Sequence, residues 1–326
     1  MTSKKWLVIY NPTAGHFRAA TLSAIMRGLE AEGIEPEARP TTHAGHAREI
    51  AAEIPPGPVV AVYGGDGSLN EAANGLAGRG IPLAFLPGGT ANVMADELGL
   101  PHNPVKAARL LARGRVRDIR PGGVRMGDGL DGAAEGERLF LLMAGFGMDA
   151  QAVYRVSPRG KKWFGKGAYV YSGLKSLLGR QTPLMVETGL RPDISETSLP
   201  PGETPETPET PGPRHPPAGW VVAARSAHYG GPFRIHPRAG LLAPRLGLVA
   251  VSHGRQLLFL ARNLVLGWHR SGKGVRLEDQ ETLRVTSPNG TPAAVQVDGE
   301  YLAHGTVFTV GLSSRTLPFL FPPEKT

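Results

Sequence analysis

The 326 residues of this sequence include no cysteine. This absence excludes disulfide bonds, thiolate catalysis and zinc sites built on sulfur. Aromatic residues make up only 6% of the chain, and no recognised nucleic-acid-binding motif is present, so we expect no nucleic-acid partner. No uninterrupted apolar run approaches the ~18–20 residues that a membrane-spanning helix needs. The first residues also lack the architecture of a signal peptide. These absences together predict a cytoplasmic protein.

Positive charge is in excess. Lysine and arginine number 36 against 28 aspartate and glutamate residues, which gives a formal net charge of +8. A basic surface favours anionic partners such as a nucleotide phosphate or an anionic membrane. The apolar fraction of 41% and the length of the chain are sufficient for a large core and for more than one domain.

The first 120 residues alternate between short apolar runs and helical patterns. Continuous apolar runs occupy residues 7–9, 59–62 and 82–86, and residues 18–32 have helical spacing. Continuous hydrophobicity is typical of strands that are covered on both faces, as in a parallel sheet with crossover helices. We therefore predict a doubly wound α/β domain over residues 1–122.

The pattern changes after residue 120. Strand-like runs separated by glycine and proline turns occupy residues 139–144, 220–224, 246–251, 283–286 and 294–297. They predict an antiparallel β-sandwich domain over residues 123–311, interrupted by helices at 167–178 and 256–269. A Pro/Thr/Glu-rich stretch at 191–217 is expected to be an exposed insertion. Residues 312–326 are expected to pack back on the first domain.

Three glycine-rich turns in the N-terminal half each join a buried strand to a helix. The first glycine turn is Asn11-Pro-Thr-Ala-Gly15, the second is Gly64-Gly-Asp-Gly-Ser-Leu-Asn-Glu71, and the third is Pro87-Gly-Gly-Thr-Ala-Asn92. Glycine lets the backbone approach a ligand closely, and a helix start presents N–H groups to an anion. In a doubly wound sheet such turns collect at the carboxyl edge of the strands. Three of them at one edge predict a binding site for a nucleotide polyphosphate.

The order and spacing of these turns resemble the catalytic domain of the diacylglycerol kinase family, which includes bacterial lipid kinases and sphingosine kinases. The resemblance continues in Gly145-Phe-Gly-Met-Asp149, in Tyr229-Gly-Gly-Pro-Phe-Arg-Ile235 and in Val297-Asp-Gly-Glu300. It implies a two-domain fold like that of NAD kinases and diacylglycerol kinases, with the active site in the interdomain cleft. It also implies a role in lipid metabolism and phospholipid biosynthesis.

The resemblance implies an enzyme that uses ATP and Mg²⁺ to phosphorylate a lipid hydroxyl, on diacylglycerol or a related glycerolipid or sphingoid lipid. Asp298 would act as the general base, and Glu300 would support it. Asp66 would organise the catalytic Mg²⁺, directly or through water. The nucleotide-binding residues would be Asn11, Gly15, Gly64, Gly65, Asp66, Gly67, Ser68, Glu71, Gly89, Thr90 and Asn92.

Simpler interpretations remain open for several of these residues. Asp298-Gly299 on its own is a standard hairpin turn. Asp66 is equally suited to hydrogen bonding with its own turn, and Glu71 to the positive end of its helix. For the whole chain, the alternatives are an NAD-kinase-like nucleotide kinase and a catalytically inactive lipid- or nucleotide-binding protein.

Two features depart from the family pattern. Val93 follows the third glycine turn where many relatives have aspartate. Residues 238–248 contain no aspartate, whereas bacterial diacylglycerol kinases often use aspartates in this stretch to hold a structural magnesium ion. We therefore predict that this second metal site is missing.

The expected partners are a lipid substrate and an anionic membrane surface that the protein contacts peripherally. Trp163 and Phe164, beside Lys161, Lys162 and Lys166, are one candidate for membrane contact, and the apolar helix predicted at 256–269 is another. An uncovered sheet edge would also permit a homodimer.

Overall fold

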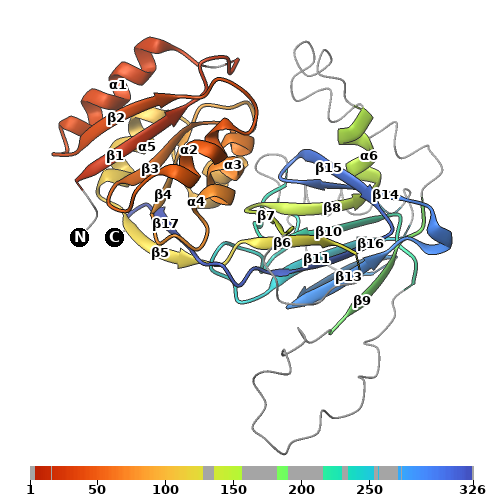
Figure 1. Cartoon of the computed structure of the whole chain (residues 1–326). Helices are drawn as coiled ribbons and strands as arrows, with labels where there is room; N and C mark the ends of the chain where they lie inside the picture. Colours follow the sequence, from red (N-terminus) through yellow and green to blue (C-terminus); the bar gives the residue numbers. More distant parts are fainter. Residues whose placement is uncertain are drawn as a thin grey trace, which may run out of the picture.

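The structure is a computed structural model that describes residues 4–15, 17–127, 136–155, 182–189, 216–229, 234–252, 256, 271–272 and 274–324. The basic segment at 160–167, the predicted helix at 167–178, nearly all of the 191–217 insertion and nearly all of the predicted helix at 256–269 lie outside these residues. Figure 1 shows an α/β lobe, drawn red to yellow, beside a β-rich lobe drawn mainly in green and blue.

The α/β lobe is built on one six-stranded sheet with the order β2-β1-β3-β4-β17-β5. All neighbouring strands are parallel except β5, which runs antiparallel to β17. The strands are β1 (Lys5–Tyr10), β2 (Glu35–Pro40), β3 (Val59–Gly64), β4 (Leu83–Pro87), β5 (Arg115–Ile119) and β17 (Leu317–Phe321). The helices of this lobe are α1 (Ala19–Glu30), α2 (His46–Glu53), α3 (Asp66–Leu76), α4 (Val93–Leu98) and α5 (Pro104–Ala112).

Two strands of this sheet illustrate how the chain forms it. Every residue of β3 is buried, as expected for a strand covered on both faces. In contrast, β17 comes from the end of the chain and lies between β4 and β5, which Figure 1 shows as a blue strand among orange and yellow ones. The last strand of the chain therefore ties the C-terminal segment to the lobe that holds the three glycine turns.

The β-rich lobe consists of two antiparallel sheets, ordered β12-β11-β10-β8-β14-β15 and β7-β6-β16-β13-β9. Side chains from both sheets, including Phe146, Val285 and Phe308, form one buried apolar cluster. The strands are β6 (Gly122–Met126), β7 (Arg138–Phe140), β8 (Met143–Gly147), β9 (Met185–Thr188), β10 (Trp220–Ala224), β11 (Leu246–Val251), β12 (Val275–Gln280), β13 (Thr282–Thr286), β14 (Ala293–Val297), β15 (Glu300–Gly305) and β16 (Val307–Leu312). This lobe also contains α6 (Met148–Arg155) and the short 3-10 helix η2 (Pro288–Gly290).

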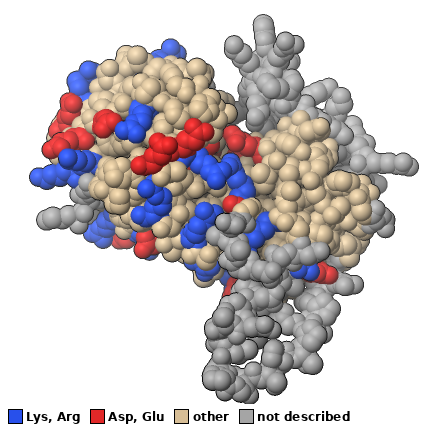
Figure 2. Space-filling view, viewed as in Figure 1, with Lys and Arg blue, Asp and Glu red and all other residues tan. Residues whose placement is uncertain are grey.

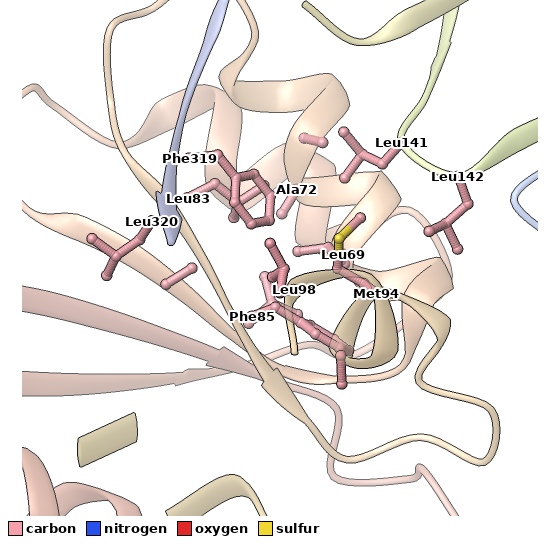
Figure 3. Packing of buried hydrophobic residues seen from close by; sticks show 14 of the residues in the cluster. Leu69, Ala72, Leu83, Phe85, Met94, Leu98, Leu141, Leu142, Phe319 and Leu320 are labelled. Atoms are coloured by element: carbon pink, nitrogen blue, oxygen red, sulfur yellow. The ribbon is translucent and has the colours of Figure 1, made fainter. Parts of the chain in front are cut away.

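The single strand that the sequence predicts at 139–144 is wrong, because the chain forms β7 and β8 with a break at Leu141 and Leu142. The backbone N–H groups at this break bond to a side chain, Asp298, instead of a neighbouring strand. The side chains of Leu141 and Leu142 join the core of the α/β lobe, where Figure 3 shows them near Leu69 of α3 and Met94 of α4. One apolar cluster therefore spans the junction of the two lobes.

Charged side chains are unevenly distributed on the face shown in Figure 2. Lysine, arginine, aspartate and glutamate are interspersed over the α/β lobe, while the described surface of the β-rich lobe is largely uncharged in this view. Within the described part of the chain, no helix has the length and apolar character needed to cross a membrane.

Candidate active site

The second and third glycine turns touch one another at the carboxyl edge of the sheet. They follow the neighbouring parallel strands β3 and β4. The Gly88 N–H donates to the Gly64 carbonyl at 2.8 Å. A Cβ atom on Gly89 would lie 2.6 Å from the Gly65 α-carbon, which is closer than such atoms can approach. Glycine at position 89 therefore allows the two backbones to meet.

Asp66 joins these two turns through its carboxylate. Its two oxygens accept hydrogen bonds from the N–H groups of Val93 and Met94, each at 3.0 Å, in the first turn of α4. Burial raises the pKa of Asp66, while these N–H groups act in the opposite direction. Asp66 therefore bonds to a different turn from its own, while its own backbone N–H, as in the simpler interpretation, also favours the ionised carboxylate.

The third glycine turn is held by Asn92. Its side-chain oxygen accepts from the Gly89 N–H at 2.8 Å, and its side-chain nitrogen donates to the Gly89 carbonyl at 2.9 Å. Asn92 has a φ of 51°, in the left-handed region that asparagine tolerates better than most residues. Thr90 lies between them with its side chain exposed.

The first glycine turn is arranged differently. The side-chain oxygen of Asn11 accepts from the backbone N–H and the hydroxyl of Thr13, at 2.9 and 2.8 Å. Phe17, just beyond the turn, packs its ring 6.0 Å from the ring of Tyr63 in β3. Gly15 is exposed, and a Cβ atom there would meet nothing within 4 Å. The first glycine turn is thus connected to the other two through the contact of Phe17 with Tyr63 in β3.

Ser68 and Glu71 extend the second glycine turn into α3. Ser68 lies over Gly64, where an added Cβ atom would be 3.2 Å from the Ser68 hydroxyl oxygen. The carboxylate of Glu71 accepts from the N–H groups of Gly45 and Ala47, at 2.9 and 3.3 Å, at the start of α2. Glu71 therefore caps a neighbouring helix.

Asp298 brings the β-rich lobe to this edge of the sheet. Its carboxylate accepts from the N–H groups of Leu141, Leu142 and Met143 at 2.8–2.9 Å, and from the side-chain amide of Asn70 in α3 at 2.7 Å. Burial raises its pKa to about 6, although these four donors favour the ionised form. Asp298 also has a φ of 48°, in the tight turn between β14 and β15.

Glu300 is exposed and lies over the first turn of α3. A Cβ atom added to Gly67 would be only 2.5 Å from Oε1 of Glu300. The first N–H groups of a helix lack partners within that helix, and they attract negative charge. The carboxylate of Glu300 therefore lies beside the N–H groups of the second glycine turn that are suited to bind phosphate.

Asn70 and Asn74 are two residues of α3 to which the sequence reasoning assigned no role in the site. Both donate to the Leu139 carbonyl, at 2.9 and 3.2 Å, and Asn74 also accepts the Leu139 N–H at 3.0 Å. Arg138 donates to the side-chain oxygen of Asn70 at 3.0 Å. The two asparagines are four residues apart, so they share one face of α3. That spacing was the available signal that they fasten α3 to β7.

A second polar contact between the lobes was also missed. Glu97 of α4 accepts hydrogen bonds from the Ser226 hydroxyl at 2.7 Å and the Ala227 N–H at 3.0 Å, and it pairs with Nδ1 of His228 at 2.9 Å. Burial opposes the ionisation of Glu97, but the bonds from His228 and Ser226 outweigh it and hold its pKa below the ordinary value.

The stretch at 238–248 is organised by a buried cation from the protein itself. The guanidinium of Arg225 donates to the carbonyls of Gly240, Leu241 and Ala243, and to that of Arg120. Burial lowers the pKa of Arg225 to about 10. In the parts of the chain that the structure describes, no three Asp, Glu or His side chains gather into a group that could hold a metal ion by itself.

Comparison with known proteins agrees with the arrangement of the turns. Residues 5–124 match the model of the diacylglycerol kinase catalytic domain. The chain is 32% identical over 180 residues to a diacylglycerol kinase of Bacillus subtilis (strain 168), covering 53% of this chain and 56% of that protein. It is 37% identical over 175 residues to a YegS-like lipid kinase of Pseudomonas aeruginosa (strain UCBPP-PA14), covering 52% and 53%.

These matches span about half the length of the curated relatives. The fold is similar over a greater length, because a solved structure named as a diacylglycerol kinase from Bacillus anthracis superposes with a TM-score of 0.69 at 18% identity, covering 99% of this chain and 98% of that chain. Over residues 5–124, the chain is therefore similar to the diacylglycerol kinase catalytic domain.

Proposed function

We propose that this protein is a lipid kinase that transfers the γ-phosphate of ATP to a lipid hydroxyl in a cleft between the two lobes. The observation that carries the proposal is the position of Glu300 over Gly67, because it brings a carboxylate of the β14–β15 turn to the phosphate-binding start of α3. In this proposal, residues 1–122 and 312–326 form the domain that binds ATP, and residues 123–311 form the domain that binds the lipid.

Asp298 is the proposed general base. As the lipid hydroxyl oxygen attacks the γ-phosphorus, its proton passes to the Asp298 carboxylate and the bond to the β,γ-bridging oxygen breaks, releasing ADP. A pKa of about 6 suits a base that works near neutral pH. Hydrogen bonds from the N–H groups of the second and third glycine turns would stabilise the negative charge of the phosphates.

The carboxylates near the start of α3 fit a magnesium ion. Mg²⁺ prefers oxygen ligands and is commonly held by one or two carboxylates together with nucleotide phosphates. Glu300 would repel a phosphate at Gly67 unless a cation lay between them, and Asp66 begins the same helix. Bound there, Mg²⁺ would neutralise charge on the transferring phosphoryl group.

The proposed acceptor is diacylglycerol or a related glycerolipid or sphingoid lipid. The names of the Bacillus and Pseudomonas relatives support a lipid acceptor. The net charge of +8 supports peripheral contact of a cytoplasmic protein with an anionic membrane. We therefore propose a role in lipid metabolism and phospholipid biosynthesis.

The test is phosphate transfer from γ-labelled ATP in the presence of Mg²⁺, with diacylglycerol, monoacylglycerol and a sphingoid base in separate mixed micelles. NAD is added as a competing acceptor. Label in one lipid supports the proposal and identifies the acceptor. Label in NAD alone would establish the nucleotide kinase instead. ATP binding without transfer to any of these acceptors would favour an inactive binding protein.

A further inference from the structure

Asp149 is a buried carboxylate that the proposed reaction does not use. It lies in the first turn of α6, and its Oδ1 accepts from the N–H of Ala150 at 2.7 Å. Its Oδ2 accepts from the side-chain nitrogen of Gln296 at 3.1 Å. A Cβ atom on Gly145 would lie 2.0 Å from Oδ2 and 2.5 Å from that nitrogen. Glycine at position 145 therefore leaves room for the pair.

The other end of Gln296 holds the turn that carries the candidate catalytic residues. The side-chain oxygen of Gln296 accepts from the Gly299 N–H at 2.8 Å. An ionised carboxylate only accepts hydrogen bonds, so Asp149 dictates which end of the Gln296 amide faces it. The amide oxygen is then directed to Gly299. In this way the hydrogen bond between Asp149 and Gln296 sets the direction of the hydrogen bond between Gln296 and Gly299.

The backbone at this point needs such support. The register between β14 and β15 shifts at Val295 and Gln296, which marks an irregularity of the kind that re-aims side chains near active sites. Asp298 and Gly299 both have positive φ values, 48° and 84°. The shift separates the Gln296–Tyr301 and Val297–Glu300 pairs beside the turn from the rest of the strand pairing, and the bond from Gln296 to Gly299 adds to the contacts that define the shape of this short segment.

We infer that Asp149 and Gln296 are a positioning pair that sets the turn at Asp298 and Gly299 and thereby the placement of Asp298 and Glu300. The inference rests on the proposed kinase function for its effect on catalysis. The pair acts on the reaction through the turn, by way of the bond from Gln296 to Gly299. The hydroxyl of Tyr229 also donates to Oδ2 of Asp149, at 3.5 Å.

The direction of the hydrogen bonds gives a sharp test. In Asp149→Asn, the side-chain NH₂ faces either the Ala150 N–H or the NH₂ of Gln296, so one acceptor is lost whichever way the amide is turned. In the second case, flipping Gln296 would turn its NH₂ against the Gly299 N–H. In Gln296→Glu, two carboxylates face one another. In the double variant, the NH₂ introduced at position 149 donates to one oxygen of the carboxylate introduced at position 296, while the other oxygen accepts from Gly299. Every donor then has an acceptor again, so the double substitution restores the hydrogen bonds from position 149 through position 296 to Gly299.

Two readouts are measured for the wild type, both single variants and the double variant. The first is kcat and the KM for ATP in lipid phosphorylation. The second is hydrogen exchange of the Gly299 amide, which does not depend on activity. We expect each single variant to lower kcat about tenfold or more, with KM changed less than about threefold, because a misplaced turn affects the reacting groups most. The Gly299 amide should exchange faster in both.

The double variant should recover kcat to within about threefold of the wild type and restore protection of Gly299. Gln296→Met, which keeps the length but removes both bonds, should behave like the single variants, and Gln280→Met on β12 serves as the matched control. Single variants with wild-type kcat and wild-type Gly299 protection would overturn the inference, as would a folded double variant no better than its parents. Absence of transfer by the wild type would reject the proposed function, and Gly299 exchange would still test the pair.

Discussion

Asp298 and Glu300 are two residues apart and have opposite surroundings. Asp298 is 9% exposed, and four donors surround its carboxylate. Glu300 is exposed and reaches across to Gly67 of the other lobe. At the scale of single residues, burial separates the two carboxylates, and it raises the pKa of Asp298 to about 6.

The pH dependence of kcat follows from this pKa. Only the ionised carboxylate accepts a proton, so kcat should rise as pH increases through about 6 and level off above it. Asp298→Asn should lose most of the activity. If Asp298→Asn stays active while Glu300→Gln loses activity, the base is Glu300 instead.

Glu97 should make the stability of the protein depend on pH in the opposite sense to a carboxyl group whose pKa is raised on folding. Its pKa is lowered in the folded state, so its contribution is present above the ordinary pKa of 4.5 and is lost as pH falls through the folded value. At pH 7 we expect Glu97→Gln to reduce the free energy of unfolding by about 1–2 kcal/mol. Urea unfolding measured from pH 7 to below pH 4.5 should show this difference constant down to 4.5 and shrinking below it. A difference that widens towards pH 4 would contradict the assignment.

At the scale of elements, the strands β1, β3 and β4 could be predicted because their apolar runs are continuous. The polar edge strand β2 was missed, since Glu35–Pro40 contains two glutamates and two prolines and becomes a strand only by pairing with β1. The break between β7 and β8 depends on Asp298, more than 150 residues further along the chain. Local pattern carries no information about such a partner.

The same limit applies to the site. The glycine turns are contiguous motifs, so their residues could be identified from the sequence and the family resemblance. Asn70 bonds to Asp298 across 228 residues, and Glu97 bonds to His228 across 131. Which long-range partner each polar side chain takes depends on how the two lobes meet. For this reason the sequence did not indicate that Glu71 bonds to the start of α2.

The start of α3 offers a matched pair of substitutions. In Gly67→Ala the new methyl group meets only the flexible end of Glu300, and alanine favours the helix, so the free energy of unfolding should stay constant or rise by up to about 1 kcal/mol. The carboxylate of Glu300 must move, and kcat should fall about tenfold.

Gly89→Ala is the comparison for this prediction. Its methyl group would meet the Gly65 backbone at 2.6 Å, so it should lower the free energy of unfolding by about 1–3 kcal/mol. Thermal unfolding and kcat of both variants test the prediction. If Gly67→Ala is destabilised as much as Gly89→Ala, or keeps full activity, Glu300 does not occupy the place assigned to it.

At the scale of the whole molecule, the lobes are joined by a shared apolar cluster and by polar contacts on several sides. Leu141 and Leu142 enter the core beside α3 and α4, as Figure 3 shows. Arg225 bonds to the carbonyl of Arg120, which lies in the connection between β5 and β6. The arginine therefore links the 240–243 loop to the chain segment that passes from one lobe to the other.

If Arg225 organises this loop, stability in the absence of nucleotide should not depend on a divalent cation. We expect a chelator to leave Tm unchanged, in keeping with the predicted absence of a second magnesium site. Arg225→Met should lower the free energy of unfolding by about 3 kcal/mol or more, because several buried carbonyls lose their donor. A marked fall in Tm on chelation would show that a metal ion supports the fold after all.

The most direct test of the central claim is the initial rate of phosphate transfer from ATP to diacylglycerol in mixed micelles, compared between the wild type and Glu300→Gln. Glu300 is exposed, so this variant should keep the wild-type Tm. The account predicts transfer by the wild type and a rate at least about a hundredfold lower for Glu300→Gln. Equal rates for the two proteins would contradict a reaction site between Glu300 and the second glycine turn.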